Sequence, residues 1–185
     1  MTQEPRIYKE STAFVVVDFQ EALMKAMEPS LKEKAVNNLR ILCEAMSILN
    51  VPVVVTEQYP KGLGRTVPEV KEKLSQTPIE KIVFSCCHDE KFMSAIEALK
   101  KKAIILTGVE THVCVLQTCL DLLAKGYSVH VVSNAVASRT ADDWSKALRL
   151  MEKAGAWITT SEIILFQLLG RAGTDEFKKI SRLVK

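Results

Sequence analysis

Several features are missing from this 185-residue chain, and each absence excludes a class of protein. No apolar run reaches the roughly 20 residues that span a bilayer, so we expect no association with a membrane. Only 7 glycines and 6 prolines occur among 48% hydrophobic residues, which excludes a disordered or collagen-like chain. The formal net charge is only +3 and no basic block exceeds three residues. Nucleic-acid binding through a dense basic face is therefore disfavoured.

Glycine-rich phosphate-binding motifs are also absent. The residues that follow the first apolar run, 18–22, contain no glycine, and the later segment 62–64 lacks the third glycine of a dinucleotide fingerprint. No GxxxxGK[ST] sequence occurs. A Rossmann-type dehydrogenase and a P-loop ATPase are excluded on these grounds, and we expect no cofactor.

Secretory features are lacking as well. Residues 1–12 have neither the apolar core of a signal peptide nor the composition of an organelle transit peptide. The cysteines are odd in number, which favours reduced thiols over a disulfide framework. The five are Cys43, Cys86, Cys87, Cys114 and Cys119. We expect a cytoplasmic protein, and the sequence leaves association with an organelle open.

What the chain does contain is a regular alternation of short apolar runs and amphipathic segments. We expect strands at 13–18, 51–56, 79–85, 103–109, 128–133 and 156–159. We expect helices at 31–49, 92–99, 113–125, 142–154, 161–169 and 174–184. This succession predicts one α/β domain over residues 1–185, with a parallel sheet covered by helices on both faces. The longest irregular piece, 57–67, is long enough to be a functional loop.

Two chemically active side chains lie where such a sheet binds its ligands, at the carboxyl ends of the first and fourth strands. Asp18 closes the first strand, and the fourth leads through 108–113 to Cys114 at a helix start. Unpaired N–H groups there favour a thiolate, so we expect the Cys114 pKa to lie below the usual value of about 8.5. The alternatives are that Asp18 only caps a turn and that Cys114 only packs in the core.

Histidine gives weaker indications. His112 lies two residues before Cys114 and could reach the same site, whereas His130 lies inside a strand. The segment 86–88, Cys-Cys-His, resembles a fragment of a zinc site but has no second ligand pair at the usual spacing. We therefore expect no metal.

Three segments together resemble the isochorismatase-like cysteine hydrolases. They are VVVDFQ at 15–20, KIVFS at 81–85 and GVETHVCV at 108–115. The loop TEQYPKGLG at 56–64 is similar to that of isochorismatase domain-containing proteins. The resemblance covers nearly the whole chain, from about residue 13 to the final helices.

The resemblance implies a three-layer α/β/α fold with a six-stranded parallel sheet of Rossmann-like order 3-2-1-4-5-6. It also implies a catalytic triad of Asp18, Lys81 and Cys114, and residues alone could not have selected Lys81. A cis peptide would join Val109 to Glu110, and backbone N–H groups near Thr111 would hold an oxyanion. The implied reaction is hydrolysis of a small-molecule amide or carbamoyl C–N bond through a thioester.

We further expect substrate contacts from Gln20, Gln58, Tyr59 and His112. The metal-binding Asp-x-His pair of nicotinamidases has no counterpart, because residues 56–59 read Thr-Glu-Gln-Tyr. The partners we expect are a small-molecule substrate and further copies of the chain. The alternative function is a non-catalytic interaction protein that retains the hydrolase fold, with an apolar surface on 163–169.

Overall fold

Six parallel strands form one sheet in the order β3-β2-β1-β4-β5-β6. The strands are β1 (Thr12–Val17), β2 (Val53–Gln58), β3 (Ile79–Lys81), β4 (Ala103–Val109), β5 (Ser128–Ala137) and β6 (Trp157–Thr159). The computed structural model describes residues 5–185. Residues 1–4 lie outside this range. They belong to the predicted domain and to the segment 1–12, in which we expect no targeting peptide. The predicted sheet and its strand order are confirmed.

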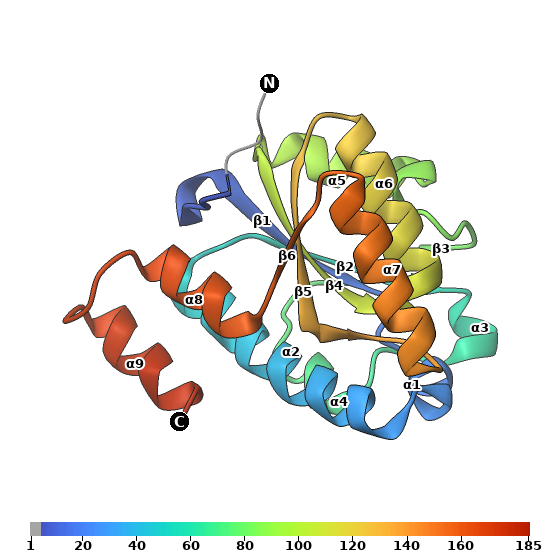
Figure 1. Ribbon diagram of the computed structural model, residues 1–185, viewed down its shortest axis with the longest axis horizontal. Helices are drawn as coiled ribbons and strands as arrows, with labels where there is room; N and C mark the ends of the chain where they lie inside the picture. The colour runs from blue at the N-terminus through green and yellow to red at the C-terminus, as the bar shows by residue number, and fades with distance from the viewer. Residues whose placement is uncertain (1–4) are drawn as a thin grey trace.

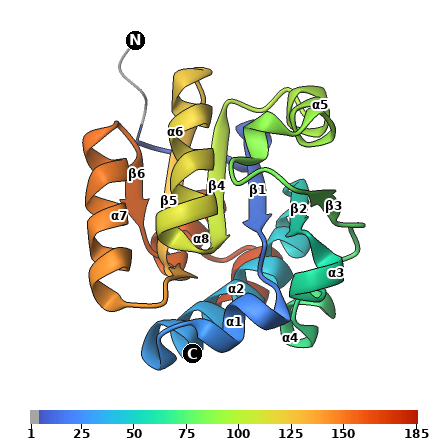
Figure 2. The same cartoon turned by 90° about the vertical axis from the view of Figure 1, so that its right-hand side faces the viewer.

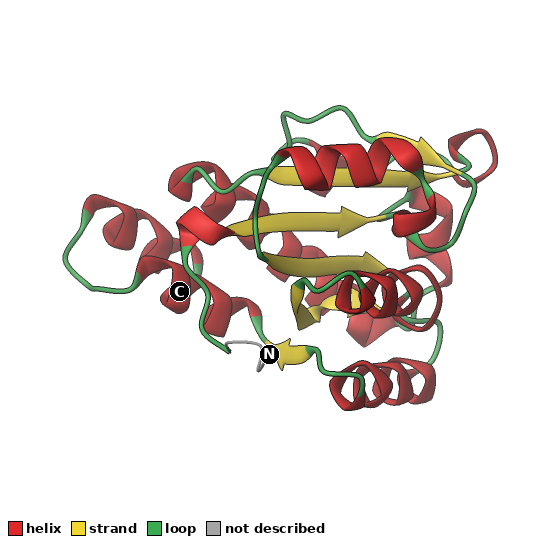
Figure 3. Ribbon diagram, turned by 90° about the horizontal axis from the view of Figure 1, so that it is seen from above, coloured by secondary structure: helices red, strands yellow, loops and turns green. Residues whose placement is uncertain are grey.

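Helices cover both faces of this sheet and make three layers (Figures 1, 2 and 3). One layer comprises α1 (Glu21–Ala26), α2 (Pro29–Leu49), α4 (Pro68–Lys71), α8 (Ser161–Leu169) and α9 (Asp175–Leu183). The other comprises α5 (Glu90–Ala98), α6 (Leu116–Ala124) and α7 (Ala141–Lys153). Within residues 5–185 each helix is too short or too polar to cross a membrane.

The central strand β1 is buried on both faces, which explains its continuous apolar run. Phe14 and Val16 belong to the core on the α2 side, whereas Ala13, Val15 and Val17 belong to the core on the α6 side. Successive strand residues point to opposite faces, so each layer of helices receives every second side chain. The sheet therefore holds the carboxyl end of β1 in a fixed place.

Several boundaries differ from the prediction, and most of them lie at this carboxyl edge. Strand β2 runs on through Gln58, so the expected irregular piece begins later and contains the short helix α3 (Pro60–Leu63). Strand β3 ends at Lys81 rather than at residue 85. The chain leaves the sheet there, and the carbonyls of Val83 and Phe84 accept hydrogen bonds from the Lys81 ammonium.

The predicted helix at 113–125 begins earlier and in an unusual form. Residues Thr111–Val115 make a π-helical segment, η3, which passes directly into α6. The carbonyl of Glu110 accepts from the N–H groups of Val113 and Val115, at 3.1 and 3.2 Å. Single π-turns of this kind occur frequently at functional sites.

Candidate active site

The carboxylate of Asp18 and the ammonium of Lys81 form an ion pair at the carboxyl ends of β1 and β3. Lys81 Nζ lies 2.6 Å from Asp18 Oδ2, and both side chains are 0% exposed. Asp18 is the first residue after β1, with φ of 48°, a conformation that is uncommon for residues other than glycine. The structure thus brings together two of the three residues that the family resemblance indicated.

Four oxygen atoms surround the Lys81 ammonium. Besides Asp18 Oδ2, these are Gln58 Oε1 at 2.9 Å and the carbonyls of Val83 and Phe84 at 3.0 and 3.2 Å. Burial disfavours the charged form of Lys81, but the Asp18 carboxylate and the thiols of Cys86 and Cys114 together outweigh it, so the pKa of Lys81 is raised. Lys81 is therefore a permanent cation, whose three protons are shared among four acceptors.

Gln20 and Gln58 connect this ion pair to the loop that follows β2. The backbone N–H of Gln58 donates to Gln20 Oε1 at 2.6 Å, and Gln20 Nε2 donates to the carbonyls of Gln58 and Gly64 at 2.9 and 2.7 Å. Gln58 Nε2 donates to the carbonyl of Ile82. Since Gln20 is fully buried and both amides are occupied within the protein, these residues hold Lys81 and the loop in place.

Cys114 lies in η3, the π-helical segment that follows β4. Cys114 is 4% exposed, and the charges of both Asp18 and Lys81 act on its thiol. The segment that carries it follows a cis peptide between Val109 and Glu110, where the resemblance places one. Gly108 allows this approach, because a Cβ at that position would lie 2.0 Å from the carbonyl oxygen of Val17. Carboxylate, ammonium and thiol therefore share one edge of the sheet.

The expected lowering of the Cys114 pKa is wrong for this arrangement. Burial raises the pKa of the Cys114 thiol, and the negative charge of Asp18 raises it further, against the opposing effect of Lys81. The position at a helix start is not sufficient to reverse these two effects. In the resting protein the proton therefore belongs to sulfur, with a carboxylate beside it that can accept it.

Thr56 and Cys86 also touch the site, and the sequence analysis did not select either of them for it. Thr56 Oγ1 donates to Asp18 Oδ1 at 2.7 Å and lies 3.7 Å from Cys86 Sγ. Both residues are buried, and burial raises the pKa of Cys86 to about 11. The available signal was the position of Thr56 near the end of β2, beside the end of β1.

The remaining predicted substrate contacts lie around the site and differ in exposure. Tyr59 is 51% exposed, whereas His112 is half-buried and its Nδ1 lies 3.0 Å from Ser138 Oγ. Thr111 is buried, and its hydroxyl has no hydrogen-bond partner among residues 5–185. Glu110 forms an ion pair with Arg139 at 2.7 Å.

The Cys-Cys-His segment takes part in packing. Cys86 and Cys87 belong to the core on the α6 side, and His88 Nε2 lies 3.3 Å from Asp121 Oδ2 on α6. Within residues 5–185, no three His, Cys, Asp or Glu side chains are grouped as metal ligands would be. The metal-independent reaction remains a prediction from the sequence.

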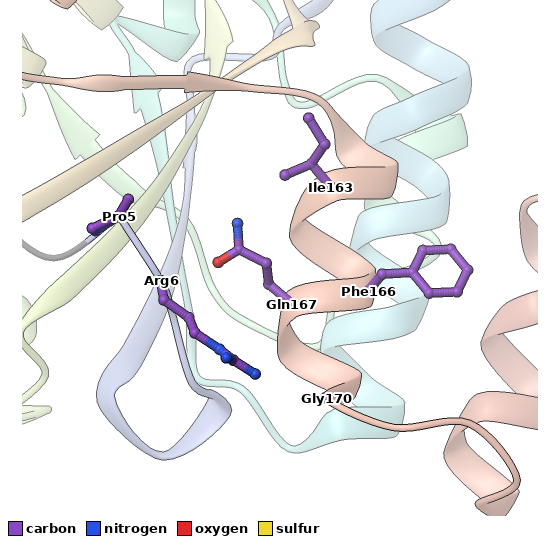
Figure 4. A pocket seen from close by; sticks show the side chains of 6 residues that line it. All are labelled: Pro5, Arg6, Ile163, Phe166, Gln167 and Gly170. Atoms are coloured by element: carbon purple, nitrogen blue, oxygen red, sulfur yellow. The ribbon is translucent and has the colours of Figure 1, made fainter.

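A separate open groove lies between the segment before β1 and α8 (Figure 4). Pro5, Arg6, Ile163, Phe166, Gln167 and Gly170 line it. Gln167 is fixed there, because its Oε1 accepts from the backbone N–H of Ile7 at 3.0 Å. None of the residues that surround Asp18 contributes to this groove.

Comparisons with known proteins identify the family of the chain. The family model described as "Isochorismatase domain" matches residues 12–163. A "Secreted isochorismatase effector Isc1" of Phytophthora sojae (strain P6497) is 42% identical over 97% of this chain and 87% of its own length.

Two solved structures have the same fold at a TM-score of 0.90. The MAR1 ribonuclease from Caenorhabditis elegans is 42% identical, over 97% of this chain and 92% of the other. The YcaC gene product from Escherichia coli, described as an octameric hydrolase of unknown specificity, is 26% identical over 99% and 92%. The chain thus has the fold of known hydrolases, and it belongs to the isochorismatase family.

Proposed function

We propose that the protein is a cysteine hydrolase that cleaves an amide or carbamoyl C–N bond of a small molecule with Cys114, Asp18 and Lys81. The observation that supports this most is the fully buried Lys81–Asp18 pair beside the Cys114 thiol. Buried ion pairs contribute little to stability, because the loss of solvation offsets their attraction. Their presence beside a nucleophile therefore favours a role in chemistry.

In the first step the Cys114 thiol transfers its proton to Asp18 as sulfur attacks the carbonyl carbon. Once Asp18 is protonated and neutral, the positive charge of Lys81 compensates the negative charge that forms as sulfur attacks. The protonated Asp18 then gives its proton to the leaving amine, and a thioester on Cys114 remains. Water attacks this thioester with Asp18 as the base, which releases the acid and restores the thiol.

The oxyanion formed in both steps would be held at the start of η3. The first N–H groups of a helical segment have no partner within it. The Val113 N–H is occupied by the Glu110 carbonyl, so we assign the oxyanion to the backbone N–H groups of Thr111 and Cys114. Each such donor contributes about 3 kcal/mol in comparable enzymes. We assign Gln20 and Gln58 to the positioning of Lys81, and Tyr59 and His112 to contact with substrate.

The competing function is a non-catalytic interaction protein with the same fold. Its basis is the apolar surface of α8, where Ile163 and Phe166 are 49% and 42% exposed. This surface is equally suited to contacts between copies of an enzyme, and the E. coli relative is described as octameric. We therefore propose a homo-oligomer, and sedimentation velocity measures its subunit number. We also propose that it is cytoplasmic, because all five cysteines are free thiols.

Ribonuclease activity is a second enzymatic candidate, because the C. elegans relative carries that name. The proposed site argues against it, since Lys81 and Asp18 are fully buried and the chain has a net charge of only +3. We expect no cleavage of single-stranded or double-stranded RNA above the level of the Cys114→Ala variant. If the wild type cleaves RNA and Cys114→Ala does not, the substrate bond is a phosphodiester and the proposal of an amide substrate is wrong.

A screen of small primary amides and carbamoyl compounds for ammonia release tests the proposal. The wild type should release ammonia from at least one compound, whereas Cys114→Ala should be inactive. Cys119→Ala is the matched control, because Cys119 is also buried, on α6, and burial raises its pKa to about 12. Equal release by wild type and Cys114→Ala would contradict the assignment.

A further inference from the structure

We propose that Thr56 is a positioning residue that sets the proton affinity of the Asp18 carboxylate and thereby the reactivity of Cys114. This inference rests on the proposed function, because it assumes that Asp18 accepts the thiol proton. Thr56 would act on Cys114 through Asp18, to which it is hydrogen-bonded.

The direction of each hydrogen bond follows from the number of hydrogens available. The Asp18 carboxylate can only accept, so the single hydroxyl hydrogen of Thr56 points to Oδ1 at 2.7 Å. The contact between Thr56 Oγ1 and Cys86 Sγ, at 3.7 Å, must then use the hydrogen of the thiol. Cys86 is itself held, since its backbone N–H donates to Thr118 Oγ1 at 2.9 Å. The Thr56 hydroxyl therefore has one fixed orientation.

Each carboxylate oxygen of Asp18 thus has a donor from a different strand. Lys81 on β3 donates to Oδ2, and Thr56 on β2 donates to Oδ1. The other ionisable groups that face the carboxylate are the thiols of Cys114 on η3 and Cys86 on the 3-10 helix η2 (Cys86–His88). Hydrogen bonds to a carboxylate favour its charged form, so the Thr56 bond makes Asp18 a weaker base than Lys81 alone would leave it.

Removal of this hydroxyl should make Asp18 a stronger base without removing any charge. A hydrogen bond to a charged group changes an equilibrium by about tenfold or more. In Thr56→Val, more of the thiol proton should reside on Asp18, so the thiolate fraction near neutral pH should rise by about tenfold. The acid limb of the pH–rate profile should move to higher pH by about one unit. Loss of a purely structural contact would instead displace Asp18 and slow the reaction.

The rate of Cys114 alkylation by iodoacetamide, resolved by peptide mass spectrometry between pH 4 and 9, tests this without a known substrate. We expect Thr56→Val to react about tenfold faster than wild type on the neutral plateau, with its acid limb at higher pH. Thr56→Ser keeps the hydroxyl and should match the wild type. Circular dichroism and urea unfolding compare the folds of the three proteins.

An unchanged or slower rate in folded Thr56→Val would overturn the proposal, as would a Thr56→Ser profile that matches Thr56→Val. The failure of the underlying function has a different signature. In that case Cys114 is not the fast-reacting thiol in wild type, or Asp18→Asn leaves its rate unchanged. A fast, Asp18-dependent Cys114 with no response to Thr56→Val would reject the role of Thr56 alone.

Discussion

Lys81 Nζ lies 2.6 Å from Asp18 Oδ2, and neither side chain has any contact with solvent. The two residues are 63 positions apart in the chain and lie at the ends of strands that are not neighbours, with β2 between them. A double-mutant cycle measures how strongly the two residues are coupled in their contribution to stability.

Lys81→Met should destabilise the protein as well as inactivate it. The substitution leaves a buried carboxylate without its counter-charge, which costs about 3–5 kcal/mol of unfolding free energy. Asp18→Asn combined with Lys81→Met removes both charges, so it should recover part of that stability while activity stays absent. Urea unfolding of the four proteins measures the coupling. A loss of stability in the double variant equal to the sum of the two single-variant losses would show that the pair is not coupled.

Gly108 should be far less tolerant of alanine than other glycines with positive φ. A Cβ there would lie 2.0 Å from the Val17 carbonyl oxygen, at φ of +119°. We expect Gly108→Ala to lower the free energy of unfolding by more than about 2 kcal/mol, since backbone must move. Gly170 is the matched control, because it has φ of +66° with nothing within 4 Å of its Cβ position. Gly170→Ala should cost about 1 kcal/mol, from backbone conformation alone. Equal losses in the two variants, measured by urea unfolding, would contradict this account.

His130 should make the protein sensitive to mild acid. Burial lowers the pKa of His130 in the folded protein to about 4, from an ordinary value of 6.5. As the pH falls, the unfolded chain binds the proton first, so the stabilising effect is complete above about pH 6.5 and is lost towards pH 4. Between pH 7.5 and pH 5 we expect a loss of about 2 kcal/mol from this group.

His130→Gln tests this, because glutamine cannot bind the proton. Its free energy of unfolding should fall less over the same pH range than that of the wild type. Urea unfolding at pH 7.5 and pH 5 measures how much the free energy of unfolding of each protein changes between them. An equal fall in the two proteins would show that groups other than His130 cause the acid sensitivity.

The sequence predicted the sheet well because the strands are buried on both faces. The run from Ala13 to Val17 is continuous and apolar, and the helix predicted at 161–169 has the bounds observed for α8. Short polar elements such as α3 and α4 were not predicted, because four residues do not show a helical period. Strand β3 was predicted too long, because Ile82 and Phe84 are apolar but 70% and 54% exposed.

The site was predictable only in part from the residues. Strand order placed Asp18 and Cys114 at the same edge, whereas Lys81 came from the family resemblance. Thr56 was not selected, since a threonine in an apolar strand is ordinary and its bond to Asp18 depends on neighbouring strands. The direction of the Cys114 pKa was predicted wrongly, because burial and the charge of Asp18 are properties of the folded chain.

The relative reactivity of the five cysteines tests the central claim most directly. Cys87 is more exposed than Cys114, at 7% against 4%, and burial raises its pKa to about 12. Exposure alone therefore predicts that Cys87 is alkylated before Cys114. Activation of Cys114 by the Asp18–Lys81 pair together predicts the opposite order.

The measurement is the site-resolved rate of iodoacetamide alkylation at neutral pH in wild type, Asp18→Asn and Cys119→Ala. Our account predicts that Cys114 reacts first in wild type and in Cys119→Ala. It also predicts that Cys114 reacts faster in Asp18→Asn, because the substitution removes the negative charge that raises the thiol pKa and leaves the Lys81 charge unopposed. A first reaction at Cys87, or an equal or slower Cys114 rate in Asp18→Asn, would contradict it.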